Sequence, residues 1–144
     1  MRSILLVFAF VGLAGGFRAP LPSAQKVHTI KLEGNSTSGR YRFDPDRISV
    51  TPGDILLFRA GSGHPHSIAF RAGDLSGQAH AALNAAMPDR TGDLRGPLLT
   101  PENSEYRMTV PALPPGDYSF YCLVHLSYKE QGELIVVLPN GKEK

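Results

Sequence analysis

The sequence GDYSFYCLVHLSYKEQGELIVV, residues 116–137, decides the fold of this chain. Polar and apolar residues alternate through Tyr118 and Phe120 as far as Cys122, and a second apolar run follows Gly132. Alternation with a period of two is typical of a half-buried β-strand. We therefore predict two strands joined by a loop that begins at Cys122 and carries His125.

Cys122 and His125 carry the chemical signal of this loop. Two residues separate them, and Cys122 is the single cysteine of the chain. A thiolate and an imidazole at the mouth of a hairpin can bind one metal ion, and these donors suit copper or zinc. His66, in the middle of the chain, supplies a second imidazole. Two histidines and one cysteine, with a weak axial donor, are the ligands of copper sites that transfer electrons.

The first residues have the pattern of an export signal. Arg2 precedes an apolar run over residues 4–14 and two glycines, which is typical of a secretory signal peptide and short for a bilayer span. The chain has 144 residues, enough for one compact domain without disulfides. We predict a signal peptide over residues 1–16, a flexible leader over residues 17–25 and one domain over residues 26–140. The mature protein is expected in the periplasm or outside the cell.

Charge and cysteine content limit the classes of binding partner and the possible roles of Cys122. The net charge is +2 and acidic and basic residues are interspersed, so we expect no nucleic-acid partner and no stable membrane insertion after removal of the signal. A lone cysteine in an oxidising compartment cannot form an internal disulfide. Either Cys122 is a buried, inert side chain, or a metal occupies its sulfur. The neighbouring His125 favours the metal.

The rest of the chain predicts short strands separated by glycine and proline turns. This spacing, of about ten residues, is typical of an antiparallel sandwich or barrel. A helix interrupts the pattern within residues 74–88, with Ser76 as its cap and Pro88 as its end. The remaining expected strands are residues 26–32, 40–43, 47–50, 55–59, 66–70 and 105–110.

Two segments together resemble the cupredoxins, the plastocyanin/azurin family of blue copper proteins. FDPDRISVTPGDILLFRAGSGHPHSIAF, residues 43–70, is similar to the family's strand-turn-strand pattern before Pro-His, and residues 116–137 are similar to its Tyr-x-Phe-x-Cys-x-x-His hairpin with a late glycine. The resemblance implies an all-β, Greek-key antiparallel β-sandwich with a short helical insertion. It also implies one type 1 copper ion and a soluble, monomeric one-electron carrier rather than an enzyme.

The resemblance assigns His66, Cys122 and His125 as the three equatorial copper ligands. The family's axial methionine lies five residues after the second histidine, and Glu130 occupies that position. Three readings follow for Glu130: it binds axially, it lies near a three-coordinate copper without binding, or Gln131 supplies an amide oxygen instead. We favour axial Glu130. A carboxylate donor stabilises Cu(II), so we expect a lower potential and altered colour compared with methionine relatives.

Other positions also depart from the family pattern. Ser67 stands where the family has an asparagine that hydrogen-bonds to the cysteine loop, and Val124 stands where plastocyanins often have proline. His64 is interpreted as a loop residue, and His28 and His80 as solvent-facing residues.

The apolar residues of the ligand loop suggest how partners dock. They predict an apolar rim around His125, the more exposed imidazole, where redox partner proteins would dock briefly. An alternative function is copper transport or storage without redox turnover, although the sequence lacks the exposed methionine or histidine clusters of such carriers. The rim residues are Leu123, Val124, Leu126 and Tyr128.

Overall fold

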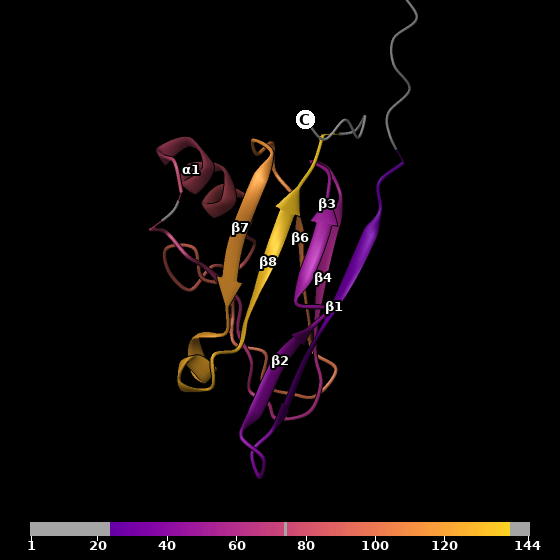
Figure 1. The fold of residues 1–144 in the computed structure, drawn as a ribbon, viewed down its shortest axis with the longest axis vertical. Helices are drawn as coiled ribbons and strands as arrows, with labels where there is room; N and C mark the ends of the chain where they lie inside the picture. Colours follow the sequence, from indigo (N-terminus) through magenta and orange to yellow (C-terminus); the bar gives the residue numbers. More distant parts are fainter. Residues whose placement is uncertain (1–23, 74, 139–144) are drawn as a thin grey trace, which may run out of the picture.

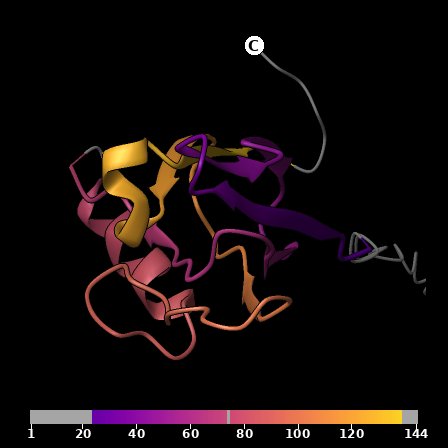
Figure 2. The ribbon, with the colours of Figure 1, turned by 90° about the horizontal axis from the view of Figure 1, so that it is seen from below.

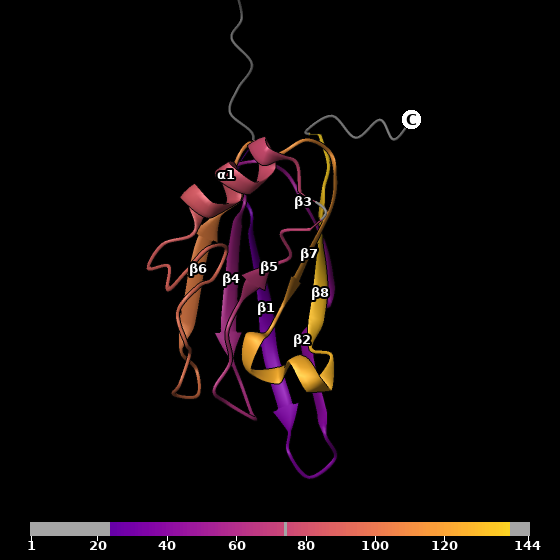
Figure 3. The ribbon, with the colours of Figure 1, turned by 90° about the vertical axis from the view of Figure 1, so that its left-hand side faces the viewer.

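The chain folds into two four-stranded β-sheets packed face to face (Figures 1 and 3). This computed structural model describes residues 24–73 and 75–138. The predicted signal peptide, most of the predicted leader and the last two residues of the predicted domain lie outside the described residues. None of the helices within the described ranges has the length and apolar character needed to cross a bilayer.

The first sheet has the strand order β2-β1-β4-β6 and the second has the order β3-β8-β7-β5. The strands of the first sheet are β1 (Val27–Asn35), β2 (Arg40–Asp44), β4 (Ile55–Ala60) and β6 (Glu105–Thr109). The strands of the second sheet are β3 (Arg47–Val50), β5 (Ala69–Phe70), β7 (Gly116–Tyr121) and β8 (Gln131–Val136).

The predicted all-β sandwich with a short helical insertion is confirmed, with one difference in strand direction. Strands β1 and β4 pair in parallel, and so do β3 and β8, whereas the other pairs are antiparallel. Both sheets are therefore mixed. Alternation along a strand shows which face is buried, but it carries no information about the direction of the neighbouring strand.

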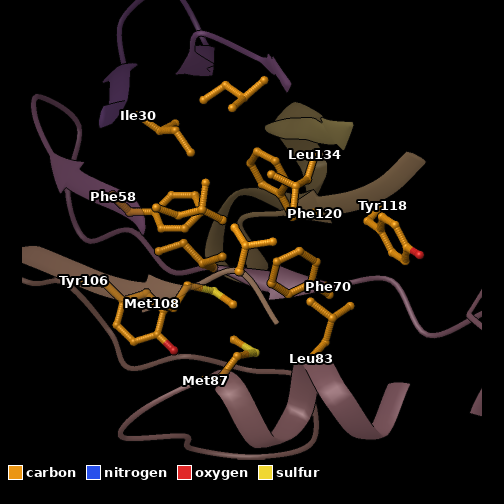
Figure 4. Close-up of a cluster of buried hydrophobic side chains, with 14 of the residues drawn as sticks. Ile30, Phe58, Phe70, Leu83, Met87, Tyr106, Met108, Tyr118, Phe120 and Leu134 are labelled. Carbon is orange, nitrogen blue, oxygen red and sulfur yellow. The ribbon is translucent and has the colours of Figure 1, made fainter. Parts of the chain in front are cut away.

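Aromatic side chains from both sheets meet in the core. The ring of Phe120 on β7 makes edge-to-face contacts with Phe43 on β2 and Phe58 on β4, at centroid distances of 4.8 and 5.7 Å. Figure 4 shows Phe58, Met108 and Phe120 within this cluster. Edge-to-face pairs at these distances match the aromatic quadrupoles, so they fix how the two sheets face each other.

The predicted helix is α1 (Gly77–Ala86). The Ser76 hydroxyl accepts a hydrogen bond from the Ala79 N–H at 3.2 Å, as expected for an N-cap. Leu83 and Met87 point from the helix into the core (Figure 4). The helix lies toward the end of the sandwich opposite the ligand loop (Figures 1 and 3).

The segment around His66 is less regular than predicted. Strand β5 covers Ala69–Phe70 alone, and His66 lies before it in an isolated bridge with Leu99. The His66 N–H donates to the Leu99 carbonyl at 3.0 Å, and the Leu99 N–H donates back at 2.8 Å. The partner that holds His66 in place is thus a single loop residue rather than a long strand.

The ligand loop between β7 and β8 forms a 3-10 helix, η1 (Leu123–Tyr128). It lies at the same end of the sandwich as the tip of the β1-β2 hairpin (Figures 1 and 3), and Figure 2 views this end directly. Two segments far apart in the sequence therefore frame one end of the molecule.

Candidate metal centre

Four buried side chains converge between η1 and the segment that precedes β5. His66, Cys122, His125 and Glu130 each present one ligand atom, and these atoms all lie within 4.8 Å of one another. These are the four residues predicted from the sequence, and the fold brings all of them together.

The β7-β8 hairpin positions three of the four. The Cys122 N–H donates to the Glu130 carbonyl at 3.0 Å, directly after the Tyr121 and Gln131 pair that closes the ladder. The His125 N–H donates to the Cys122 carbonyl at 3.3 Å, which turns its ring back toward the sulfur. The hairpin backbone therefore determines where the sulfur, the imidazole and the carboxylate lie.

The orientation of the His66 ring is set by a backbone carbonyl. Its Nε2 lies 2.9 Å from the Ser62 carbonyl oxygen. A carbonyl can only accept, so Nε2 carries the hydrogen and donates it. The other ring nitrogen, Nδ1, then faces Cys122 and Glu130. Metal-binding histidines commonly have this arrangement, with one nitrogen held by an acceptor and the other free to bind.

Glu130 lies between the two imidazoles. One carboxylate oxygen, Oε2, is 2.7 Å from His125 Nδ1, and the other, Oε1, is 3.2 Å from His66 Nδ1. The second contact is not aligned as a hydrogen bond, and among the described residues neither His66 Nδ1 nor Glu130 Oε1 has a hydrogen-bond partner. Buried polar atoms without partners are rare and costly. A cation bound between them would satisfy both.

The spacing of the sulfur also fits a metal ion. The Cys122 Sγ lies 3.4 Å from His125 Nδ1. Tetrahedral binding of sulfur and nitrogen to one ion places these atoms roughly 3.5 Å apart. A soft thiolate with two imidazoles suits copper, and the carboxylate adds a harder, charged donor. The residues present therefore fit a copper ion.

The electrostatics of His66 favour positive charge at the cluster. Burial lowers the pKa of His66, but the Cys122 sulfur, the Glu130 carboxylate and the Ser62 carbonyl outweigh this effect and raise the pKa to about 10. These groups stabilise a cation at this position.

Ser67 joins the two halves of the centre. Its N–H donates to the Cys122 Sγ at 3.3 Å, and its hydroxyl oxygen accepts from the Leu123 N–H at 3.0 Å. In the family that the sequence resembles, an asparagine at this position hydrogen-bonds to the cysteine loop. Serine makes the same kind of connection here with a shorter side chain.

His125 is more covered than expected. It is 7% exposed, against 0% for His66, because the ring of Tyr41 on β2 lies over it at a centroid distance of 3.9 Å. Sequence analysis missed Tyr41. The available signal was its spacing of two from Phe43, since residues i and i+2 of a strand share a face. That shared face reaches from the core to the metal centre.

The other candidate residues lie elsewhere. Gln131 is exposed and its amide oxygen accepts from Arg71 at 3.4 Å, so the geometry favours Glu130 over Gln131. His64 is exposed in its loop, as expected. Two further histidines pair with carboxylates at 2.9 Å, namely His28 with Asp54 and His80 with Asp93.

Apolar side chains surround the centre on the outside. The predicted rim residues are all exposed, and Leu98 is exposed near them along an apolar groove that Leu123 and Val124 also line. The rim residues are Leu123, Val124, Leu126 and Tyr128.

Comparison with known proteins agrees with this geometry. Residues 29–137 match the profile of the copper binding proteins of the plastocyanin/azurin family. A plastocyanin from Synechococcus sp. is 26% identical over 136 residues, which are 94% of this chain and 91% of the relative. A plastocyanin from Dryopteris crassirhizoma is 30% identical over 107 residues, 74% of this chain and 98% of the relative. The structure of its oxidized form superposes with a TM-score of 0.56, covering 74% of this chain and 99% of that chain.

Proposed function

Because this chain belongs to the plastocyanin/azurin family of copper-binding proteins, we propose that it is a mononuclear type 1 copper protein that carries single electrons between redox partners. Its cofactor is one copper ion. His66, Cys122 and His125 are the proposed equatorial ligands, and Glu130 is the proposed axial ligand. The observation that supports this assignment is that His66 Nδ1 and Glu130 Oε1 lie 3.2 Å apart in the buried four-residue cluster, and neither atom has a hydrogen-bond partner within residues 24–73 and 75–138.

The role of the protein residues is to fix the positions of the copper ligands and to exclude water from the site. When bound, copper supplies a site that accepts and releases one electron. The sandwich keeps the four side chains buried, and burial excludes water. Backbone hydrogen bonds to Ser62 and from Ser67 fix the His66 ring and the Cys122 sulfur. A cage that is already in place needs little rearrangement when its charge changes.

Partner proteins are proposed to dock at the end of the molecule that carries η1. The apolar rim of Leu123, Val124, Leu126 and Tyr128 is exposed there, on the same 3-10 helix that carries the buried His125. Weak redox encounters bury small areas, and exposed apolar residues of this number suit such a contact. We place the protein in an exported compartment, periplasmic or secreted, on the basis of the signal pattern in residues 1–16.

Copper titration followed by absorption and paramagnetic-resonance spectroscopy tests the centre. The bound Cys122 thiolate is expected to give a charge-transfer band that Cys122→Ser removes. His66→Ala is expected to weaken copper binding by at least about tenfold, as loss of a metal-site residue does. His64→Ala, two residues away and exposed, is the matched control and should bind as the wild type does. Absence of the band in the wild type would contradict the assignment.

Reduction kinetics separate a carrier of electrons from a carrier of copper. An electron carrier exchanges electrons quickly with a small-molecule reductant and keeps its metal against a competing chelator. Slow transfer with ready release of copper would instead support transport or storage. Turnover of nitrite or oxygen by the purified chain would point to an enzyme.

A further inference from the structure

The half-buried ring of Tyr41 packs against the buried His125 ring at the metal centre. Its centroid lies 3.9 Å from that of His125, with an interplanar angle of 32°. Tyr128 packs against the same tyrosine at a centroid distance of 4.6 Å and an angle of 39°, and its ring also lies 6.2 Å from that of His125. Tyr128 is 46% exposed. Tyr41 thus contacts both a buried residue of the metal centre and an exposed residue of the ligand loop, and the three rings form one cluster.

Close packing within the β1-β2 hairpin determines where the Tyr41 ring lies relative to His125. Tyr41 pairs across the hairpin with Gly34, and a Cβ atom on Gly34 would lie 2.3 Å from Cδ1 of the tyrosine ring. A side chain at position 34 therefore has no room. Behind Gly34 lies Gly63, with φ of +73°, whose Cβ would fall 2.6 Å from the Gly34 Cα. Two glycines let the backbone support the ring directly.

The same hairpin reaches the second histidine through one carbonyl. The Gly34 N–H donates to the Ser62 carbonyl oxygen at 2.8 Å. That oxygen also accepts from His66 Nε2 at 2.9 Å. The hairpin is therefore linked to both imidazoles, to His66 by a shared hydrogen-bond acceptor and to His125 by ring stacking.

We propose that Tyr41 is a positioning residue for the metal centre: its ring, supported by Gly34, holds the His125 imidazole in the orientation that binds copper. This inference rests on the metal centre proposed above. His125 belongs to η1 and has non-helical backbone angles within it. The Glu130 carboxylate holds the ring at its Nδ1 edge alone, at 2.7 Å, and the Tyr41 ring covers its face. Stacking against Tyr41 therefore restricts rotation that the contact at the edge does not prevent. Metal then binds without first ordering the imidazole.

Tyr41→Leu and Tyr41→Phe test this role. An aromatic pair contributes enough to change affinity by about three- to tenfold. Tyr41→Leu is therefore expected to bind copper, and cobalt as a spectroscopic probe, about three- to tenfold more weakly in chelator competition. Tyr41→Phe keeps the ring and is expected to bind as the wild type does. Nuclear magnetic resonance of the copper-free and zinc-loaded proteins should show the His125 ring becoming mobile in Tyr41→Leu alone.

Gly34→Ala displaces the ring without removing it, and should reproduce the loss seen in Tyr41→Leu. Combining the two substitutions should cause no further loss, because both act through one contact. Gly77→Ala is the matched control, since a Cβ at Gly77 meets open space. Thermal unfolding of each copper-free variant establishes that it is folded at the temperature of the binding assay.

The outcomes separate the two proposals. Weaker binding and a mobile His125 ring in Tyr41→Leu, both rescued in Tyr41→Phe, support the positioning role. Equal binding and an equally rigid ring in wild type and Tyr41→Leu overturn it while leaving the copper centre intact. Additive losses in the Gly34→Ala double variant also overturn it. A wild-type protein that binds no copper overturns the proposed function and this inference with it.

Discussion

The backbone N–H of Ser67 donates a hydrogen bond to the Sγ of Cys122, although the two residues are 55 positions apart in the chain. Ser67 directly follows His66, and Cys122 lies between β7 and η1. Both segments that build the centre therefore fix the position of the proposed thiolate ligand. Hydrogen bonds to a bound sulfur tune the electronic properties of a metal site.

Replacing Ser67 tests the side chain beside that bond. Ser67→Ala removes the hydroxyl that accepts from the Leu123 N–H, and a lost hydrogen bond of this kind is expected to lower the free energy of unfolding by about 1 kcal/mol. Urea unfolding measures the change. Ser67→Asn should restore the bond, and Ser49→Ala, at an exposed position of β3, is the control. Wild-type stability in Ser67→Ala would show that this contact is unimportant.

Replacing Glu130 tests the fourth ligand. Glu130→Met exchanges a charged, hard donor for a neutral thioether. This exchange stabilises Cu(I) relative to Cu(II), so the reduction potential is expected to rise. Each tenfold change in that preference corresponds to about 59 mV for one electron, and we expect a rise of about 60 to 120 mV. Voltammetry gives the value. Glu133→Met, on a carboxylate that pairs with Arg47 on the surface, should leave the potential nearly unchanged; an equal shift in both variants would argue against coordination by Glu130.

The buried carboxyl of Asp54, remote from the metal centre, is expected to make the folding stability sensitive to acid. Burial raises the pKa of this carboxyl, but the hydrogen bonds that it accepts from the Thr51 N–H, the His28 ring and the Lys26 N–H outweigh that effect and lower it from 3.8 to about 2. Between about pH 4 and pH 2, the Asp54 carboxyl takes up a proton in the unfolded chain but not in the folded chain. The stabilisation, of about 2 kcal/mol, is therefore complete above about pH 4 and is lost as the pH falls toward about 2.

Asp54→Asn should remove this part of the pH dependence. Urea unfolding of the copper-free protein between about pH 2 and pH 5 gives the difference between wild type and variant. Asp117→Asn, at an exposed carboxylate, should keep the wild-type slope. Parallel curves for wild type and Asp54→Asn would show that the carboxyl does not contribute to acid sensitivity.

Gly132 is expected to tolerate no side chain. A Cβ at this position would lie 2.5 Å from the Phe120 ring and 2.8 Å from the Asp46 carbonyl oxygen. Gly132→Ala should lower the free energy of unfolding by about 1 to 3 kcal/mol, because the core ring and the backbone must both move. A denaturant midpoint equal to that of Gly73→Ala, where a Cβ meets open space, would contradict the packing described here.

Three of the four residues of the centre could be predicted because their positions are encoded locally. Cys122 and His125 share one loop, and Glu130 is counted along the same hairpin. Short runs between glycine and proline turns likewise predicted the β1, β4 and β6 regions. His66 came from the resemblance over residues 43–70 as well as from its chemistry.

The surroundings of the centre could not be predicted, because they depend on contacts between distant segments. Nothing near His125 in the chain indicates that Tyr41 covers it. The bridge from His66 to Leu99 spans the helical insertion, and the sequence around Leu99 follows no strand pattern. Parallel pairing of β1 with β4 also leaves no trace in an alternating sequence.

The helical insertion leaves and rejoins the sandwich through backbone bonds on neighbouring residues. The Phe70 N–H donates to the Leu94 carbonyl and the Gly96 N–H to the Ile68 carbonyl, beside the bridge between His66 and Leu99. The two ends of this excursion are thus clamped together next to a copper ligand, whatever the chain does in between. Since closing a longer loop adds little entropic cost, insertions at exposed positions of this excursion should be tolerated as long as Leu83 and Met87 keep their places in the core. The clamp separates the exposed part of the insertion, which can vary in length, from a centre that must keep its shape.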